Sequence, residues 1–411
     1  MFIPSVRQAV ILAGGRGSRL APLTNSIPKP MVDVNGEPFL AHLMRLVINQ
    51  GITQVIVLTG YRGGQIHDHF GDGEGFGIEI IYSHRPESWS TGERLLAATP
   101  LLDASFLLMY ADNYVAFDLQ ALLAQPGAAD AAMILTVCPK KQGNIIMGPN
   151  GSVARYLQDR SSGPGEFVEV GFSLVSRDHI LAALTGSEAS LPAAIDSMTQ
   201  AGDVSAHVIH HPYFSVSDPQ RLERTRLALS YRRVLLLDRD GVINVKAGLG
   251  KYVSHYKDFR PIESSWTALQ LLAEHGFTFV VISNQAGVAR GITDPRDLDE
   301  IHKQMIEELG KIGVNILGVY VCPHHWDDEC SCRKPNAGMF YDAAADHSLL
   351  LSDLIYIGDD IRDEAAALGA GCTPVIIGPE AANVKSKSTV GFEGLKQAVP
   401  FVLDHYQRQG K

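Results

Sequence analysis

The fold of the second half is decided by Val234-Leu-Leu-Leu-Asp238-Arg-Asp240-Gly241-Val-Ile-Asn244. Four apolar residues run directly into two carboxylates one residue apart, and a glycine follows. A short apolar run that stops at a turn signal is typical of a buried parallel strand. In open α/β sheets the chemistry lies at the carboxyl ends of the strands. We therefore expect Asp238 and Asp240 at a strand tip within reach of one metal ion; taken alone, the stretch also fits an ordinary turn.

The composition predicts a soluble α/β enzyme with two domains. The chain has 411 residues, more than one ordinary core accommodates. An apolar fraction of 45% and 39 glycines fit that class, and a net charge of −10 argues against a nucleic-acid-binding surface. No apolar run is long enough to span a membrane, and the segment 1–7 lacks the layout of a signal peptide. We expect a cytoplasmic protein without a nucleic-acid or membrane partner; an oligomer is compatible with the sequence.

Other predicted strand tips carry matching polar groups. One apolar strand ends at Ser283-Asn284-Gln285, and another, from Leu354, ends at Gly358-Asp359-Asp360. Because the tips of parallel strands share one edge of a sheet, we expect these groups to meet Asp238 and Asp240 there. Carboxylates suit a cation, whereas the hydroxyl of Ser283 and the ammonium of Lys334 suit a phosphate.

A cysteine-rich loop precedes Lys334. Within eleven residues the chain places Cys322, His324, Cys330 and Cys332. Three thiolates and an imidazole form a closed tetrahedral set suited to structural Zn²⁺, with His325 as an alternative imidazole and unliganded thiols as the plainer interpretation. Five cysteines in this spacing fit a reducing compartment with one metal site better than a disulfide framework.

These motifs, in this order, resemble the haloacid-dehalogenase (HAD) phosphatases over residues 234 to about 378. D-R-D-G-V-I-N, S-N-Q-A-G-V-A-R-G, the cysteine loop, R-K-P and I-G-D-D are most similar to the heptose bisphosphate 7-phosphatase subgroup. The histidinol phosphatases share the zinc loop.

The resemblance implies a role for each polar residue. Asp238 is expected to be the nucleophile that forms an aspartyl phosphate, and Asp240 the acid and base. Mg²⁺ is expected on Asp238, Asp359 and the backbone carbonyl of Asp240. Phosphate binding is assigned to Ser283 and to the catalytic Lys334, and substrate contacts to Asn284, Gln285 and Arg333.

The first half opens with an apolar strand, Gln8 to Ala13, that runs into Gly14-Gly15-Arg16-Gly17-Ser18-Arg19-Leu20. The dinucleotide fingerprint requires a glycine where Leu20 stands, and the Gly-Lys-Ser/Thr of a P-loop is absent. What remains is a loop whose free backbone N–H groups at Gly14, Gly15 and Gly17 can cradle phosphates, with Arg16 and Arg19 adding charge. Lys29 lies between two prolines, which fixes its ammonium.

The stretch from Ala13 to Met31 resembles the sugar-phosphate nucleotidyltransferases, marked by a strand, a G-G-x-G-x-R loop and P-K-P. The resemblance implies that the loop and Arg19 hold a nucleoside triphosphate, with GTP favoured, and that a sugar phosphate is the second substrate. It implies that Lys29 neutralises the attacked phosphate and that Asp112 binds Mg²⁺. A surface connector and a capping aspartate are the alternatives.

Some positions depart from that family. Ser215 stands where a second metal-binding aspartate is expected, and strand alternation points the nearby Asp218 to the other face. Gln158-Asp159 replaces an E-K pair, and the segments 89–93 and 169–171 are altered. The first half is therefore either a transferase with unusual ligands, a weak one, or a binding module without catalysis.

We expect an N-terminal Rossmann-like nucleotidyltransferase domain with a mixed sheet over residues 1–230. A HAD-like α/β domain with a zinc loop is expected over 231–411. The segment 219–233 is predicted to be a basic amphipathic helix with a solvated arginine face. The whole chain would remove the 7-phosphate of a heptose 1,7-bisphosphate and transfer a nucleotide to the remaining 1-phosphate. Alternatives are a heptose bisphosphate or histidinol phosphate phosphatase with a non-catalytic front half, and a non-enzymatic scaffold.

Overall fold

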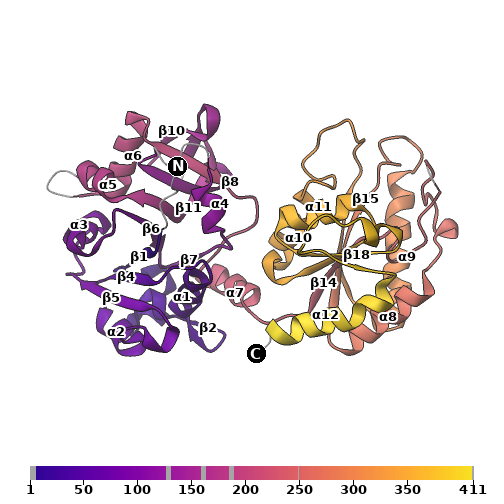
Figure 1. Cartoon of the computed structure of the whole chain (residues 1–411), viewed down its shortest axis with the longest axis horizontal. Helices are drawn as coiled ribbons and strands as arrows, with labels where there is room; N and C mark the ends of the chain where they lie inside the picture. Colours follow the sequence, from indigo (N-terminus) through magenta and orange to yellow (C-terminus); the bar gives the residue numbers. More distant parts are fainter. Residues whose placement is uncertain (1–5, 126–130, 159–162, 185–188, 249, 410–411) are drawn as a thin grey trace. The chain divides into compact units, whose positions relative to one another are not determined.

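The computed structural model describes residues 6–125, 131–158, 163–184, 189–248 and 250–409, so Asp159 of the Gln158-Asp159 pair lies outside it. The chain divides into two compact units, Met1–Leu229 and Ser230–Lys411 (Figure 1). Each unit is an α/β structure with its own apolar core, as predicted. No helix within the described ranges is long and apolar enough to cross a membrane.

The first unit is built on a nine-stranded mixed sheet in the order β10-β9-β11-β6-β1-β4-β5, with β8 joined to β11 and β12. β1 runs parallel to β4 and β6, whereas β11 is antiparallel to β6. Successive residues of β1 enter two different cores, because side chains alternate across a strand: Ile11 packs in one and Val10 in the other. The strands are β1 (Gln8–Ala13), β2 (Asp33–Val34), β3 (Glu37–Pro38), β4 (Gln54–Thr59), β5 (Glu79–His84), β6 (Ser105–Tyr110), β7 (Asn113–Tyr114), β8 (Met133–Gly143), β9 (Ile145–Met147), β10 (Val153–Tyr156), β11 (Gly165–Ser176), β12 (Val204–Val208) and β13 (Phe214–Ser215). The helices are α1 (Phe39–Asn49), α2 (Gly63–Phe70), α3 (Thr91–Ala97), α4 (Leu119–Leu123), α5 (Arg177–Ala183), α6 (Leu191–Ala201) and α7 (Pro219–Ala228).

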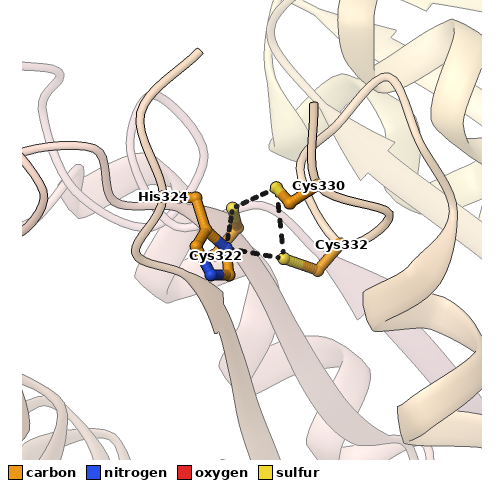
Figure 2. Close-up of side chains that lie close together, drawn as sticks. All are labelled: Cys322, His324, Cys330 and Cys332. Carbon is orange, nitrogen blue, oxygen red and sulfur yellow. Dashed lines mark hydrogen bonds between the residues drawn. The ribbon is translucent and has the colours of Figure 1, made fainter. Parts of the chain in front are cut away.

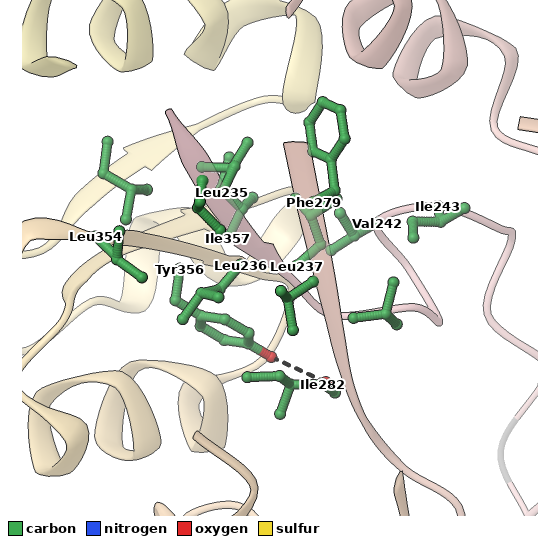
Figure 3. Packing of buried hydrophobic residues seen from close by; sticks show 14 of the residues in the cluster. Leu235, Leu236, Leu237, Val242, Ile243, Phe279, Ile282, Leu354, Tyr356 and Ile357 are labelled. Atoms are coloured by element: carbon green, nitrogen blue, oxygen red, sulfur yellow. Dashed lines mark hydrogen bonds between the residues drawn. The ribbon is translucent and has the colours of Figure 1, made fainter. Parts of the chain in front are cut away.

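The second unit is built on a six-stranded parallel sheet in the order β16-β15-β14-β17-β18-β19. The central strand β14 is apolar throughout because a parallel sheet is covered on both faces. Figure 3 shows its leucines 235–237 packed with Phe279 of β15 and Ile357 of β17. The strands are β14 (Val234–Leu237), β15 (Thr278–Asn284), β16 (Ile316–Cys322), β17 (Ile355–Gly358), β18 (Thr373–Ile377) and β19 (Val390–Phe392). The helices are α8 (Glu263–Glu274), α9 (Pro295–Lys311), α10 (Gly338–His347), α11 (Ile361–Ala370) and α12 (Leu395–Gln409).

The helix predicted over 219–233 is shorter than expected. α7 ends at Ala228, and the arginines near the end of the segment do not lie on a solvated helix face. Arg232 donates to the backbone oxygen of His347 at 2.9 Å, and Arg233 donates to that of His275 at 2.6 Å. Both carbonyls lie at helix C-termini, where backbone oxygens lack helical partners and the helix dipole favours a cation.

Candidate active sites

The carboxyl end of β14 delivers Asp238 and Asp240 to a turn that only glycine permits. Gly241 has a φ of 94°, and a Cβ atom built there would lie 2.1 Å from the Oδ2 atom of Asp359. The missing side chain therefore lets the carboxylate at the tip of β17 approach the turn after β14. The two strand tips meet as predicted from their parallel pairing.

Three carboxylates of the second unit form a cluster. Asp238, Asp359 and Asp363 each offer an oxygen within 4.8 Å of the others. Lys246 donates to both oxygens of Asp359 at 2.9 and 3.0 Å, so a cationic group already lies against the cluster. Carboxylate oxygens are the ligands that Mg²⁺ prefers. The residues therefore fit a divalent cation.

The cluster contains one carboxylate beyond the predicted ligand set. Asp363 was not predicted, and its carboxylate lies beside those of Asp238 and Asp359. The available signal was the D-x-x-x-D spacing: Asp359 lies just before the N-cap of α11, and Asp363 lies in the first turn of that helix. The predicted ligand from Asp240 was its backbone carbonyl, which stays a prediction.

Asp240 is held by a separate network. Its carboxylate accepts hydrogen bonds at 2.8 Å from the Arg239 guanidinium, from Asn244 and from Gln285. Arg239 is fully buried and its Nη1 atom also lies 3.0 Å from Nε2 of His302. Burial alone would raise the pKa of Asp240, but Arg239 and the two amides outweigh it and lower that pKa. In the free protein Asp240 is therefore an oriented anion.

Lys334 lies between two members of the cluster, Asp238 and Asp363. Its Nζ atom is 3.0 Å from Asp238 and 2.8 Å from Asp363. Burial opposes the charge of this ammonium, but the two carboxylates outweigh that effect and raise the pKa of Lys334. Asn284 holds the lysine from behind, because its side-chain amide exchanges two 3.0 Å hydrogen bonds with the Lys334 backbone. Burial raises the pKa of Asp238, and Lys334 opposes that shift.

A pocket of about 380 Å³ opens over these groups. Six residues predicted from the sequence line it, namely Asp238, Asp240, Ser283, Asn284, Arg333 and Lys334. Gln285 lies behind the wall instead, and its amide donates to Ser283 at 2.9 Å as well as to Asp240. Gln285 therefore orients two pocket residues, and its predicted contact with substrate stays untested. Lys246, Lys251 and Arg362 also line the pocket, which suits an anionic substrate.

The four predicted zinc donors lie together beside the pocket. Figure 2 shows Cys322, His324, Cys330 and Cys332 facing one another. Neighbouring donor atoms are 3.1–3.6 Å apart. A tetrahedron around Zn²⁺ has edges of about 3.8 Å for sulfur ligands, so a slight expansion admits the ion. His324 supplies the imidazole, whereas His325 lies 3.2 Å from Asp327.

The first unit carries a second pocket, of about 720 Å³. All six residues predicted for this half line it, namely Gly14, Gly15, Gly17, Arg19, Lys29 and Asp112. Lys29 and Asp112 form an ion pair. Gly17 has a φ of 68°, and a Cβ atom there would lie 2.8 Å from the Lys29 side chain. The glycine thus lets Lys29 cross the loop. Arg16 pairs with Glu87.

Arg94 supports the glycine loop and was not predicted. It is 3% exposed, and its guanidinium donates to the carbonyls of Thr59 at 2.6 Å and Pro86 at 2.7 Å. A Cβ atom at Gly14 would lie 2.6 Å from its Nε atom. A sequence motif does not distinguish this buried arginine from a solvated one, because its partners are backbone carbonyls outside its own helix.

Ser215 lies beside Asp112, at the position expected for a second carboxylate. β13 pairs Ser215 with Asn113, and the Val216 backbone N–H donates to the Asp112 carbonyl at 2.9 Å. The Ser215 hydroxyl accepts from Arg221 at 3.3 Å. In the part of the chain that the structure describes, no set of three metal donors includes Asp112.

Asp218 lines the same pocket, so the expectation that it points to the other face is wrong. The strand β13 ends at Ser215, and alternation no longer applies beyond it. The Asp218 carboxylate caps α7 by accepting from the Arg221 backbone N–H at 2.9 Å. It is therefore already engaged as a helix cap.

Comparison with known proteins separates the two units. Residues 8–146 match the family model "Nucleotidyl transferase", and residues 233–370 match "Polynucleotide kinase 3 phosphatase". The chain is 37% identical over 146 residues to D-glycero-beta-D-manno-heptose-1,7-bisphosphate 7-phosphatase from Pseudomonas aeruginosa, covering 36% of this chain and 81% of that protein. The chain belongs to the heptose-1,7-bisphosphate 7-phosphatase family.

Two solved structures are also similar. D,D-heptose 1.7-bisphosphate phosphatase from B. bronchiseptica, complexed with magnesium and phosphate, is 31% identical and covers 42% of this chain and 98% of its own, with a TM-score of 0.39. HddC from Yersinia pseudotuberculosis is 22% identical and covers 54% of this chain and 98% of its own, with a TM-score of 0.47.

As a member of the heptose-1,7-bisphosphate 7-phosphatase family, the chain is an enzyme of the hydrolase class. It also carries a unit that resembles sugar-1-phosphate nucleotidyltransferases.

Proposed function

We propose that the chain is a bifunctional enzyme of nucleotide-activated heptose biosynthesis. Residues 231–411 hydrolyse the 7-phosphate of a heptose 1,7-bisphosphate with Mg²⁺. Residues 1–230 transfer a nucleotide from a nucleoside triphosphate, GTP favoured, to the remaining heptose 1-phosphate. The observation that carries the proposal is the convergence of Asp238, Asp240 and Lys334 on one pocket in a chain of this phosphatase family.

In the first step an Asp238 carboxylate oxygen attacks the phosphorus, and the bond from phosphorus to the sugar oxygen breaks. Asp240 gives its proton to the departing oxygen, so the sugar leaves as an alcohol. Arg239 keeps Asp240 anionic in the free protein. A phosphate dianion placed beside Asp240 raises its pKa, and this allows the acid to be protonated when the substrate is bound.

In the second step water attacks the aspartyl phosphate. Asp240, now anionic, takes a proton from that water, and the bond between Asp238 and phosphorus breaks to release inorganic phosphate. Ser283 and Lys334 hold the phosphoryl oxygens throughout. Mg²⁺ on Asp238, Asp359 and the Asp240 backbone carbonyl would supply positive charge that lowers the repulsion between carboxylate and phosphate.

In the first unit, the glycine loop and Arg19 cradle the triphosphate, and Lys29 lies against the attacked phosphate. An oxygen of the sugar 1-phosphate attacks the α-phosphorus, and pyrophosphate leaves. Asp112 would hold Mg²⁺ together with the phosphates. Zn²⁺ in the cysteine loop is structural, because four protein donors leave no open position. We place the enzyme in the cytoplasm.

One incubation tests both activities. The protein is supplied with heptose 1,7-bisphosphate, Mg²⁺ and each nucleoside triphosphate in turn, while phosphate, pyrophosphate and nucleotide sugar are followed. We expect phosphate with every nucleotide and pyrophosphate with one. Asp238→Asn should release no phosphate yet form pyrophosphate when heptose 1-phosphate is given directly. Lys29→Gln should release phosphate from the bisphosphate but form no pyrophosphate. Absence of phosphate release by the unmodified protein would refute the proposal.

A phosphatase with a non-catalytic nucleotide- or sugar-binding front half is the second candidate. Ser215 beside Asp112 favours it, because only one carboxylate then stands where two are expected. Phosphate release without pyrophosphate for any nucleotide would select it. Histidinol phosphate, tested beside the heptose bisphosphate, separates the remaining substrate class.

A further inference from the structure

Tyr356 is a fully buried tyrosine whose hydroxyl reaches the phosphatase site. It lies on β17, and its ring packs edge-on against Phe340 of α10 at a centroid distance of 4.8 Å. Figure 3 shows the hydroxyl directed at Ile282 of β15, away from the leucines of β14. Phenylalanine would fill the same apolar space, so packing alone does not account for the hydroxyl.

The hydroxyl connects two charged groups of the site. It accepts a hydrogen bond from Nζ of Lys334 at 2.7 Å and donates to Asp363 at 3.0 Å. The carbonyl of Ile282 is a poorer acceptor at 3.4 Å, so the single hydroxyl proton goes to the carboxylate. Tyr356 therefore fixes the distance between the ammonium and Asp363 from the side opposite the pocket.

Counting protons shows that the hydroxyl is not needed to satisfy Lys334. The ammonium has three protons and faces four oxygens, those of Ile282, Tyr356, Asp238 and Asp363. Without the hydroxyl, three acceptors remain for three protons. Removing it should thus leave the lysine paired and the fold intact, while the ammonium loses its shortest contact.

We propose that Tyr356 is a positioning residue of the phosphatase. The oxygens of an arriving phosphoryl group compete with Asp238 for the protons of the Lys334 ammonium. The Tyr356 hydroxyl then keeps that ammonium beside Asp238. The inference rests on the proposed phosphatase chemistry of the second unit. Tyr356 should therefore affect the transfer of the phosphoryl group and leave the binding of the sugar unchanged.

Tyr356→Phe tests the proposal because it removes only the oxygen. We expect kcat to fall about tenfold, the loss that one hydrogen bond to a charged group predicts, with KM changed less than twofold. Inhibition by orthovanadate, which resembles the phosphoryl transition state, should weaken by a similar factor. A purely structural role would leave the vanadate inhibition constant of the folded enzyme unchanged.

Tyr406→Phe is the matched control. Its hydroxyl is also buried. It donates to the carbonyl of Val234 and accepts from the N–H of Ile355, at the amino ends of β14 and β17. We expect it to lower Tm without changing kcat. The proposal is overturned if Tyr356→Phe keeps the kcat of this control. It is also overturned if both Tyr356→Phe and Tyr356→Met fail to fold, because the hydroxyl then serves stability.

Each variant is assayed with p-nitrophenyl phosphate and with heptose 1,7-bisphosphate. If the protein turns over only p-nitrophenyl phosphate, the proposed sugar substrate is wrong. The comparison of Tyr356→Phe with the unmodified protein then still tests the role of Tyr356. If the unmodified protein turns over neither, calorimetric binding of orthovanadate with Mg²⁺ replaces kcat. Equal vanadate affinity in the unmodified protein and Tyr356→Phe would then refute the inference.

Discussion

Cys332→Ser removes one of the four donors that would close residues 322–332 around zinc. In the chain-entropy treatment of a cross-link, closing a loop of about ten residues is worth about 2.7 kcal/mol at 25 °C. At roughly 2 to 4 °C of Tm per kcal/mol for a unit of this size, we expect the second unit to melt about 5 to 10 °C lower.

Turnover should fall about tenfold and not vanish. The cysteine loop ends at Cys332, two residues before Lys334, so its opening frees one side of that lysine. The other side stays fixed by the two 3.0 Å hydrogen bonds from Asn284. The loss therefore corresponds to part of the orientation of one charged group, on the order of 1.4 kcal/mol.

Calorimetry, zinc analysis and phosphate release on the same preparations measure the three quantities. The unmodified protein should carry about one zinc per chain, and Cys332→Ser much less. Cys372→Ala is the matched control: this buried thiol of the same unit lies outside the cluster, so its loss should lower Tm and leave zinc unchanged. Equal Tm and zinc content in Cys332→Ser and the unmodified protein would refute the assignment.

Three further outcomes follow from the charges. Arg239→Gln removes a fully buried guanidinium and leaves the half-buried Asp240 without its cation. We expect the free energy of unfolding, measured in urea, to fall by about 3 to 5 kcal/mol, and the phosphatase activity to be lost. Mg²⁺ should raise the Tm of the second unit more at pH 8 than at pH 6, because protons compete for Asp238, whose pKa is raised by burial; EDTA should reverse the gain. Burial lowers the pKa of His211 to about 4, whereas the unfolded chain takes up that proton near pH 6.5, so stability of the first unit should fall by up to about 3 kcal/mol as pH drops from 6.5 to 4. His211→Gln should flatten this dependence in urea titrations at pH 6.5 and 5.

The sequence predicted which strand tips meet, because that follows from local patterns and one topological rule. The apolar run of β14 identifies a buried parallel strand, and parallel strand tips share an edge, so Asp238 and Asp359 had to meet. Asp363 escaped that reasoning because a carboxylate in the first turn of a helix is an ordinary cap. Tyr356 was not predicted because an aromatic residue within a buried strand is normally part of the hydrophobic core.

Arginines held by backbone carbonyls were the least predictable feature. Arg94 and Arg232 donate to backbone carbonyls whose positions depend on segments far away in the chain. Sequence patterns assign arginine to solvent because its burial is costly without partners, and they do not reveal unpaired carbonyls at helix ends or loop turns. Such carbonyls hold Arg232 beyond the end of α7 and hold Arg94 beneath the glycine loop.

The two pockets differ in how their carboxylates are balanced. In the second unit Asp238, Asp359 and Asp363 form a cluster able to hold a cation before substrate arrives. In the first unit Asp112 already has Lys29 as counter-charge, and Ser215 offers a neutral hydroxyl where a second carboxylate was expected. One neutralised carboxylate is a poor site for Mg²⁺, which needs several oxygen ligands. We therefore expect any Mg²⁺ in the first unit to arrive with the phosphates of a nucleotide, so the two proposed reactions should differ in their dependence on Mg²⁺.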